Sequence, residues 1–130
     1  MEYEKGKIYF FECDQRGRNT RNDGFLNSNK GYERPFVIIS SEMWNKSQRN
    51  DGMYAIPLTK SGSGNTFSFS LGNDDIKDSK EFVGSIVLCD KICRVSERDK
   101  YVKHFTNAKL GYQAISAIKN KINQFIRTNF

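Results

Sequence analysis

Residues 31–40, Gly-Tyr-Glu-Arg-Pro-Phe-Val-Ile-Ile-Ser, constrain the fold of this chain more than any other segment. Residues 37–39 are β-branched, and a continuous run of this kind is typical of a strand that is covered on both faces. Pro35 lacks the amide hydrogen that a central ladder requires, so it suits the start of a strand. We therefore expect a buried strand over residues 34–41, with the charge of Arg34 at its first position. This segment alone leaves open whether Arg34 is a functional cation or a surface charge in a hairpin.

The length and the cysteine content indicate a single intracellular domain. A chain of 130 residues can form one core, over residues 1–130, without disulfides or metal. Cys13, Cys89 and Cys93 are odd in number and lack Cys-x-x-Cys spacing, which favours free thiols in a reducing cytoplasm over a disulfide framework or a zinc site. The chain has no apolar run long enough to span a membrane, and its N-terminus does not resemble a signal peptide. We therefore expect a cytoplasmic protein without a membrane anchor.

Positive charge is concentrated in the last third of the chain. The net charge is +6, yet residues 1–90 carry 12 basic and 13 acidic side chains, whereas residues 91–130 carry 9 basic and 2 acidic ones. Such a distribution suits a polyanion such as nucleic acid, an acidic protein partner, or simply a solvated basic face.

The apolar pattern predicts a mainly β protein that ends in a helix. Further strands are expected at residues 7–13, 53–59, 67–71, 85–95 and 102–106. Pro57 indicates an edge position, a bulge or a bend. This order of elements favours an α+β fold, a small curled antiparallel sheet or barrel capped by the terminal helix.

Four further segments have patterns that predict a local structure or a role. Residues 42–49 suit a short helical turn, and we expect Trp44 in the core or at a dimer interface. Residues 96–99 resemble a helix start. Isoleucines and Phe125 at helical spacing predict an amphipathic helix over residues 111–127, with Lys119 and Lys121 facing solvent or a partner. The polar segment 14–33 is long enough to be functional or mobile.

Three motifs, in this order, resemble the toxin ribonucleases of the MazF/PemK family. They are Arg34-Pro35 at the start of a buried strand, Ile-Pro-Leu-Thr at residues 56–59, and Gly-Ser-Ile-Val-Leu-Cys-Asp-Lys-Ile at residues 84–92. With Lys5-Gly6, residues 67–71 and the terminal helix, the resemblance covers nearly the whole chain. It implies an SH3-like barrel similar to CcdB, with a C-terminal helix.

The resemblance also implies an activity. Members of the family are homodimers that cleave single-stranded RNA, chiefly mRNA, at selected sequences without a metal or other cofactor, and a cognate antitoxin neutralises them. The ribose 2′-hydroxyl attacks the phosphate and leaves 2′,3′-cyclic phosphate and 5′-hydroxyl ends. The family's catalytic arginine and threonine correspond to Arg34 and Thr59.

The expected RNA-binding residues lie mainly in the segment before Arg34. Ser28 matches a family serine, but Asn29 and Lys30 replace the usual Glu and Gln, and Lys91 replaces a glutamine after Asp90. Cations and aromatic rings together suit single-stranded RNA, although loop aromatics equally often anchor a loop to the core. The candidates are Arg16, Arg18, Arg21, Ser28, Lys30, Tyr32 and Lys91, with Phe25 interleaved among them.

The two candidate catalytic side chains suit charge stabilisation better than proton abstraction. A guanidinium offers planar donors to phosphate oxygens and stays protonated, so Arg34 suits a clamp or an acid for the leaving oxygen. Thr59 can donate to the phosphate or the 2′-oxygen, but an unassisted hydroxyl is a poor base. His104 is the sole histidine, which excludes a two-histidine mechanism within one subunit. The general base therefore stays unassigned.

Two other functions are compatible with the sequence. A CcdB-like toxin would poison DNA gyrase without cleaving RNA, and a plain nucleic-acid-binding barrel would use Arg34 and Thr59 only structurally. The combination of Arg34 with Thr59 favours the ribonuclease. The sequence shows no Gly-rich phosphate loop, no His/carboxylate metal cluster and no Ser-His-Asp set, so we expect no metal dependence.

Overall fold

The computed structural model describes residues 3–13, 32–47, 52–60, 64–76, 80–95 and 102–130. The candidates Arg16, Arg18, Arg21, Ser28 and Lys30, together with Phe25 and the expected helix start at residues 96–99, lie outside these ranges. The elements are β1 (Lys7–Cys13), β2 (Tyr32–Ile38), α1 (Glu42–Lys46), β3 (Met53–Thr59), β4 (Ser68–Ser70), η1 (Asn73–Asp75), β5 (Ile86–Leu88), β6 (Cys93–Val95), β7 (Val102–Lys109) and α2 (Tyr112–Asn129).

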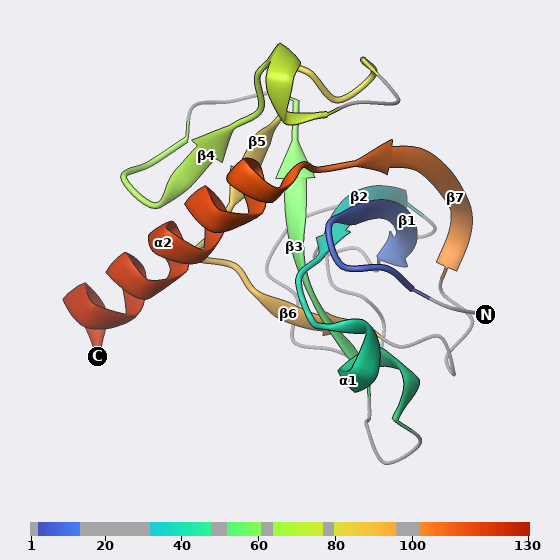
Figure 1. Cartoon of the computed structure of the whole chain (residues 1–130), viewed down its shortest axis with the longest axis horizontal. Helices are drawn as coiled ribbons and strands as arrows, with labels where there is room; N and C mark the ends of the chain where they lie inside the picture. Colours follow the sequence, from blue (N-terminus) through green and yellow to red (C-terminus); the bar gives the residue numbers. More distant parts are fainter. Residues whose placement is uncertain (1–2, 14–31, 48–51, 61–63, 77–79, 96–101) are drawn as a thin grey trace.

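The strands of the described residues form one curled antiparallel sheet. Seven strands pair in the order β4-β5-β3-β2-β1-β7, and β6 also pairs with β3. Figure 1 shows that β1, β2 and β7 curve strongly, and that α2 passes beside β4. The predicted fold class, a curled antiparallel sheet with a C-terminal helix, is therefore confirmed.

Alternating side chains give the sheet two apolar faces. On one face, the cross-strand partners Ile8, Val37 and Ile56 are fully buried in a cluster that also contains Ile118 of α2. On the other face, Tyr9 and Phe36 belong to a second cluster. The continuous apolar run in β2 thus reflects burial on both faces, as its sequence predicts.

The strand that contains Arg34 differs from the prediction in its bounds. It spans Tyr32–Ile38 rather than residues 34–41, so Arg34 lies inside the strand and not at its start. The reason is that β1 continues as its partner to Cys13, which pairs with Tyr32. Pairing with β1 therefore supports two residues before Arg34 that the sequence pattern alone assigns to a loop.

The prediction of a single strand over residues 85–95 is wrong. The chain turns after Leu88, where the Lys91 amide donates to the Leu88 carbonyl over 2.9 Å, and it resumes as β6 at Cys93. Both short strands pair with the longer β3, β6 with its first half and β5 with its end. The turn explains why Asp90 and Lys91 interrupt an otherwise apolar segment.

Pro57 does not mark an edge strand, because β3 has partners on both sides. Residues 53–55 of β3 pair with β6, whereas Leu58 and Thr59 pair with β5. Pro57 lies between these two pairings and has no partner in β5 or β6, while Phe36 of β2 is its partner on the other side.

Trp44 is not a core residue. Its side chain is 44% exposed on α1, where its ring centroid lies 5.9 Å from that of Tyr54. Its Nε1 donates to the Gly52 carbonyl over 3.3 Å, so the indole polar group is satisfied at the surface. The helix itself begins at an N-cap, Ser41, whose hydroxyl accepts from the Trp44 amide.

The predicted terminal helix is confirmed as α2, Tyr112–Asn129. Ile115 and Ile118 are buried, and Ile122 packs against the same cluster. Lys119 is exposed, whereas the Lys121 ammonium donates to the Thr66 carbonyl over 3.0 Å and so ties the helix to the start of β4. The helix follows from its apolar spacing, as expected.

Candidate active site

Arg34 is half-buried in the middle of the sheet. It pairs with Phe11 of β1, and Phe36 lies two residues further along the same face. Its Nε atom is buried. Phe11 and Phe36 pack edge to face with centroids 5.6 Å apart. Sequence reasoning missed these two rings, although their two-residue alternation with Tyr9 and Ile38 signals a shared face.

The register between β2 and β3 relates Arg34 to Thr59. Phe36 pairs with Pro57, Val37 with Ile56, and Ile38 with Ala55. Continuing this register by two residues aligns Arg34 with Thr59. Because side chains alternate along each strand, Arg34 belongs to the same face as Phe36, and Thr59 to the same face as Pro57. The two residues, 25 positions apart in the sequence, thus belong to one face of the sheet, just past the last pair of the β2–β3 ladder.

Two prolines coincide with the end of the β2–β3 ladder. The last pair is Phe36 with Pro57, and Pro35 follows at the next position toward Arg34. Neither proline can donate a backbone hydrogen bond, so the ladder has few donors left at this point. From here β3 pairs with β5, where Thr59 lies opposite Ile86. Arg34 and Thr59 thus follow immediately after the point at which their strands stop pairing with each other.

Of the remaining described candidates, Tyr32 shares the strand of Arg34, whereas strand pairing does not bring Lys91 or His104 to this point. Lys91 follows the end of β5 that is remote from Ile86, the partner of Thr59. Tyr32 begins β2, two residues before Arg34. His104 pairs with Phe10 along the edge of β1 that faces away from β2, so β1 separates its backbone from that of Arg34. The general base therefore remains without a structural candidate among the described residues.

Lys60 follows Thr59 directly but belongs to the other face of the sheet. Its ammonium lies 6.0 Å from the ring centroid of Phe82, a fully buried member of the cluster beneath α2. At this distance the contact is a weak cation–π interaction. Lys60 is therefore not part of the Arg34–Thr59 face.

Cys89 is unsuited to nucleophilic chemistry. Burial, with a smaller contribution from the charge of Asp90, raises the pKa of its thiol to about 12. Cys89 and Cys93 are both buried free thiols, as predicted. We expect Cys89 to resist alkylation by iodoacetamide at pH 8 in the native protein and to react in urea, because the reactive thiolate is scarce and inaccessible. Peptide mapping by mass spectrometry checks this residue separately from Cys13, and rapid native labelling of Cys89 contradicts it.

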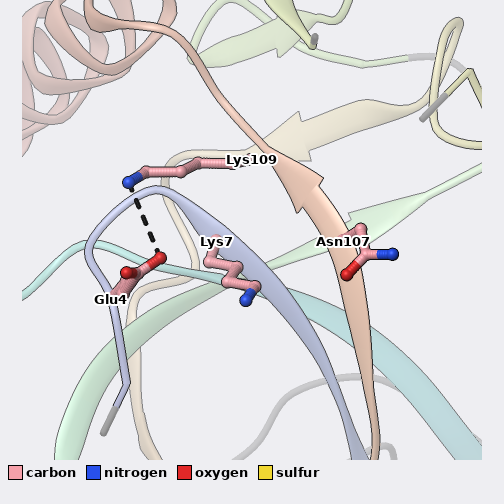
Figure 2. Close-up of a pocket in the computed structure, with 4 residues that line it drawn as sticks. All are labelled: Glu4, Lys7, Asn107 and Lys109. Atoms are coloured by element: carbon pink, nitrogen blue, oxygen red, sulfur yellow. Dashed lines mark ion pairs between the residues drawn. The ribbon is translucent and has the colours of Figure 1, made fainter. Parts of the chain in front are cut away.

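A shallow pocket of about 310 Å³ lies away from Arg34, at the opposite end of β1. It is lined by Glu4, Lys7, Asn107 and Lys109, as Figure 2 shows. The Glu4 carboxylate and the Lys109 ammonium are 3.6 Å apart and both half-exposed, so this ion pair contributes little to stability. Within the described residues, no group of three or more His, Cys, Asp or Glu side chains is arranged to hold a metal ion.

The sequence pattern of the PemK-like, MazF-like toxins of type II toxin–antitoxin systems matches residues 4–126. The chain belongs to this family. The predicted membership is therefore confirmed, and the match includes the motifs around Arg34, Thr59 and Asp90. Among curated proteins, no sequence matches significantly.

Solved structures of this toxin family have the same fold. A MazE–MazF complex from Deinococcus radiodurans is similar with a TM-score of 0.68 and 17% identity, covering 98% of each chain. A mycobacterial endoribonuclease bound to its cognate antitoxin gives a TM-score of 0.64 and 16% identity, again over 98% of each chain. Another mycobacterial endoribonuclease structure gives a TM-score of 0.61 and 14% identity, covering 100% of this chain and 96% of the other.

No helix in the described part of the chain has the length and apolar character needed to cross a membrane.

Proposed function

We propose that this PemK/MazF-family toxin is a metal-independent endoribonuclease that cleaves single-stranded RNA at selected sequences. The observation that carries the proposal is the register of β2 with β3, which, continued two residues past its last pair, sets Arg34 opposite Thr59 on one face of the sheet. We propose that this arrangement offers a cation and a hydroxyl to one RNA phosphate. Such a pair can bind a phosphate and one of its flanking oxygens.

The chemistry follows from what these two groups can do. The ribose 2′-oxygen attacks the adjacent phosphorus, the bond to the 5′-oxygen breaks, and the products carry a 2′,3′-cyclic phosphate and a 5′-hydroxyl. Arg34 stabilises the extra negative charge on the phosphate oxygens and donates toward the leaving oxygen. Thr59 donates to a phosphate oxygen and holds the reacting sugar in line. Burial of the Arg34 Nε atom reduces the freedom of the guanidinium, which favours such preorganisation.

The test is incubation of the purified protein with mixed single-stranded RNA in excess EDTA. We expect cleavage at a recurring sequence and 5′-hydroxyl ends, which polynucleotide kinase labels without prior dephosphorylation. Intact RNA would overturn the proposal. Intact RNA together with trapped DNA–gyrase complexes would instead support a CcdB-like gyrase poison.

Thr59→Val provides a more specific test, because valine keeps the shape and the β-branch but removes the hydroxyl. We expect the cleavage rate to fall by about 10- to 100-fold, the loss of one hydrogen bond to a charged transition state. Thr59→Ser keeps the hydroxyl and should retain most activity. Single-turnover rates on one RNA oligonucleotide measure both variants, and equal rates for Thr59→Val and the wild type contradict the role of the hydroxyl.

We also propose that the protein acts as a cytoplasmic homodimer and is neutralised by an acidic antitoxin. The basic excess in residues 91–130 supports a negatively charged partner, which a disordered acidic segment can satisfy by folding on binding. Adding the product of the adjacent upstream reading frame should block cleavage stoichiometrically. Light scattering of the free toxin measures its oligomeric state directly.

A further inference from the structure

A second pocket, of about 320 Å³, lies where the start of β1 meets the first turns of α2. Its floor is aliphatic, from Leu110 and Ile115, and three lysines also line it, Lys5, Lys109 and Lys119. None of its lining residues is acidic. The pocket therefore combines apolar surface with three positive charges and supplies no carboxylate of its own to balance them.

Lys5 and Lys119 line this pocket together. The neighbouring Lys119 side chain, burial and the repulsion between the two positive charges lower the pKa of Lys5. Two like charges in one pocket repel each other in the free protein. An anion placed between the two ammonium groups attracts both of them and so offsets their mutual repulsion.

The backbone around Lys5 is held in place rather than free to move away. The Gly6 amide donates to the Ile38 carbonyl over 2.7 Å, and the Leu110 amide donates to the Gly6 carbonyl over 2.8 Å. Gly6 has a φ of +88°, and a Cβ there would lie 3.3 Å from the Leu110 carbonyl oxygen. The Lys5-Gly6 step thus joins the ends of β2 and β7 and fixes Lys5 beside α2.

One of the three lysines already has a carboxylate partner. Glu4 pairs with Lys109, the lysine that the two pockets share. In Figure 2 the Glu4 side chain reaches toward Lys109. A carboxylate of a ligand can therefore bind Lys5 and Lys119 without displacing Glu4 from Lys109.

We propose that this pocket binds an acidic peptide segment, with its carboxylates on Lys5 and Lys119 and an apolar side chain on Leu110 and Ile115. Lysine ammonium groups suit carboxylates, and the aliphatic floor suits a leucine-like side chain. Tyr112, 87% exposed at the rim, adds apolar surface beside it. Single-stranded RNA favours a cationic track with several aromatic stacking faces, whereas this pocket has one aromatic ring, Tyr112, and two aliphatic side chains, Leu110 and Ile115.

The inference locates a contact for an acidic partner and in that respect rests on the proposed function. It does not depend on catalysis. The Gly6 end of β1 pairs with the Ile38 end of β2, whereas Arg34 pairs with Phe11 near the other end. An Arg34 variant that no longer cleaves RNA should therefore bind the peptide as the wild type does, and failure of the ribonuclease proposal leaves this result unchanged.

The experiment measures binding of a fluorescein-labelled peptide of repeated Glu-Leu-Asp units by fluorescence anisotropy at low salt. The double variant Lys5→Gln/Lys119→Gln should weaken binding by about tenfold. Lys80→Gln/Arg127→Gln removes the same charge from residues outside the pocket and should change affinity by less than about twofold. Lys5→Arg/Lys119→Arg keeps both charges and should keep the affinity.

Several results would overturn the inference. Equal weakening in both glutamine double variants shows that net charge alone attracts the peptide. Absence of binding to the wild type, or equal binding of a Gln-Leu-Asn control peptide, removes the role of the carboxylates. If a labelled RNA oligonucleotide depends on Lys5 and Lys119 while the acidic peptide does not, the pocket is an RNA contact instead.

Discussion

Replacing Arg34 with alanine should lower the rate of RNA cleavage by about 100- to 1,000-fold, the cost of removing one preorganised donor to a developing charge. Among the described residues of β2, Arg34 is the one cation, and the β2–β3 register continued two residues past its last pair sets it opposite Thr59. No other described side chain on this face of β2 can replace it. Single-turnover cleavage of an RNA oligonucleotide with one cleavage site measures the effect.

Arg34→Lys provides the informative companion variant. It keeps the charge but loses the planar pair of donors, so we expect activity between that of the wild type and that of Arg34→Ala. Lys80→Ala, at an exposed residue whose ammonium donates to the Asn73 carbonyl, serves as a control with one charge removed elsewhere. Circular dichroism confirms that each variant is folded. Undiminished cleavage by folded Arg34→Ala rules out the assigned role.

The largest effect on stability is expected for Ile118→Ala. Ile118 is fully buried between α2 and the face of the sheet that carries Ile8, Val37 and Ile56. Truncation removes apolar contact and leaves a cavity in a packed core, so the free energy of unfolding should fall by about 2–5 kcal/mol. Urea denaturation followed by circular dichroism, at one fixed protein concentration, measures the change.

Ile126→Ala is the matched control on the same helix. Its side chain is 48% exposed near the C-terminal end of α2, so the same truncation removes little buried surface. The free energy of unfolding should change by no more than about 0.5 kcal/mol. Similar losses for Ile118→Ala and Ile126→Ala contradict the placement of α2 on the sheet.

Local patterns predicted the elements whose stability depends on near neighbours in the sequence. The alternation in residues 7–13 and 53–59 gives β1 and β3 with the expected bounds, and the isoleucine spacing gives α2. The predicted strand bounds were wrong where pairing with a strand distant in the sequence sets them. The split between β5 and β6 follows from their shared partner β3, and β2 begins at Tyr32 because β1 continues beside it.

The sequence by itself determined the family, through Arg34-Pro35, the strand end at Thr59 and the segment 84–92, and it nominated Arg34 and Thr59 individually. Only the tertiary structure decided how those two residues relate. Side chains alternate along each strand, but pairing sets which residues stand opposite one another, and the register of β2 with β3, continued two residues past its last pair, sets Arg34 opposite Thr59. In the same way, only the fold brings Lys119 of α2 and Lys5, which precedes β1, into the lining of one pocket, because contacts between remote segments depend on how the chain folds back on itself.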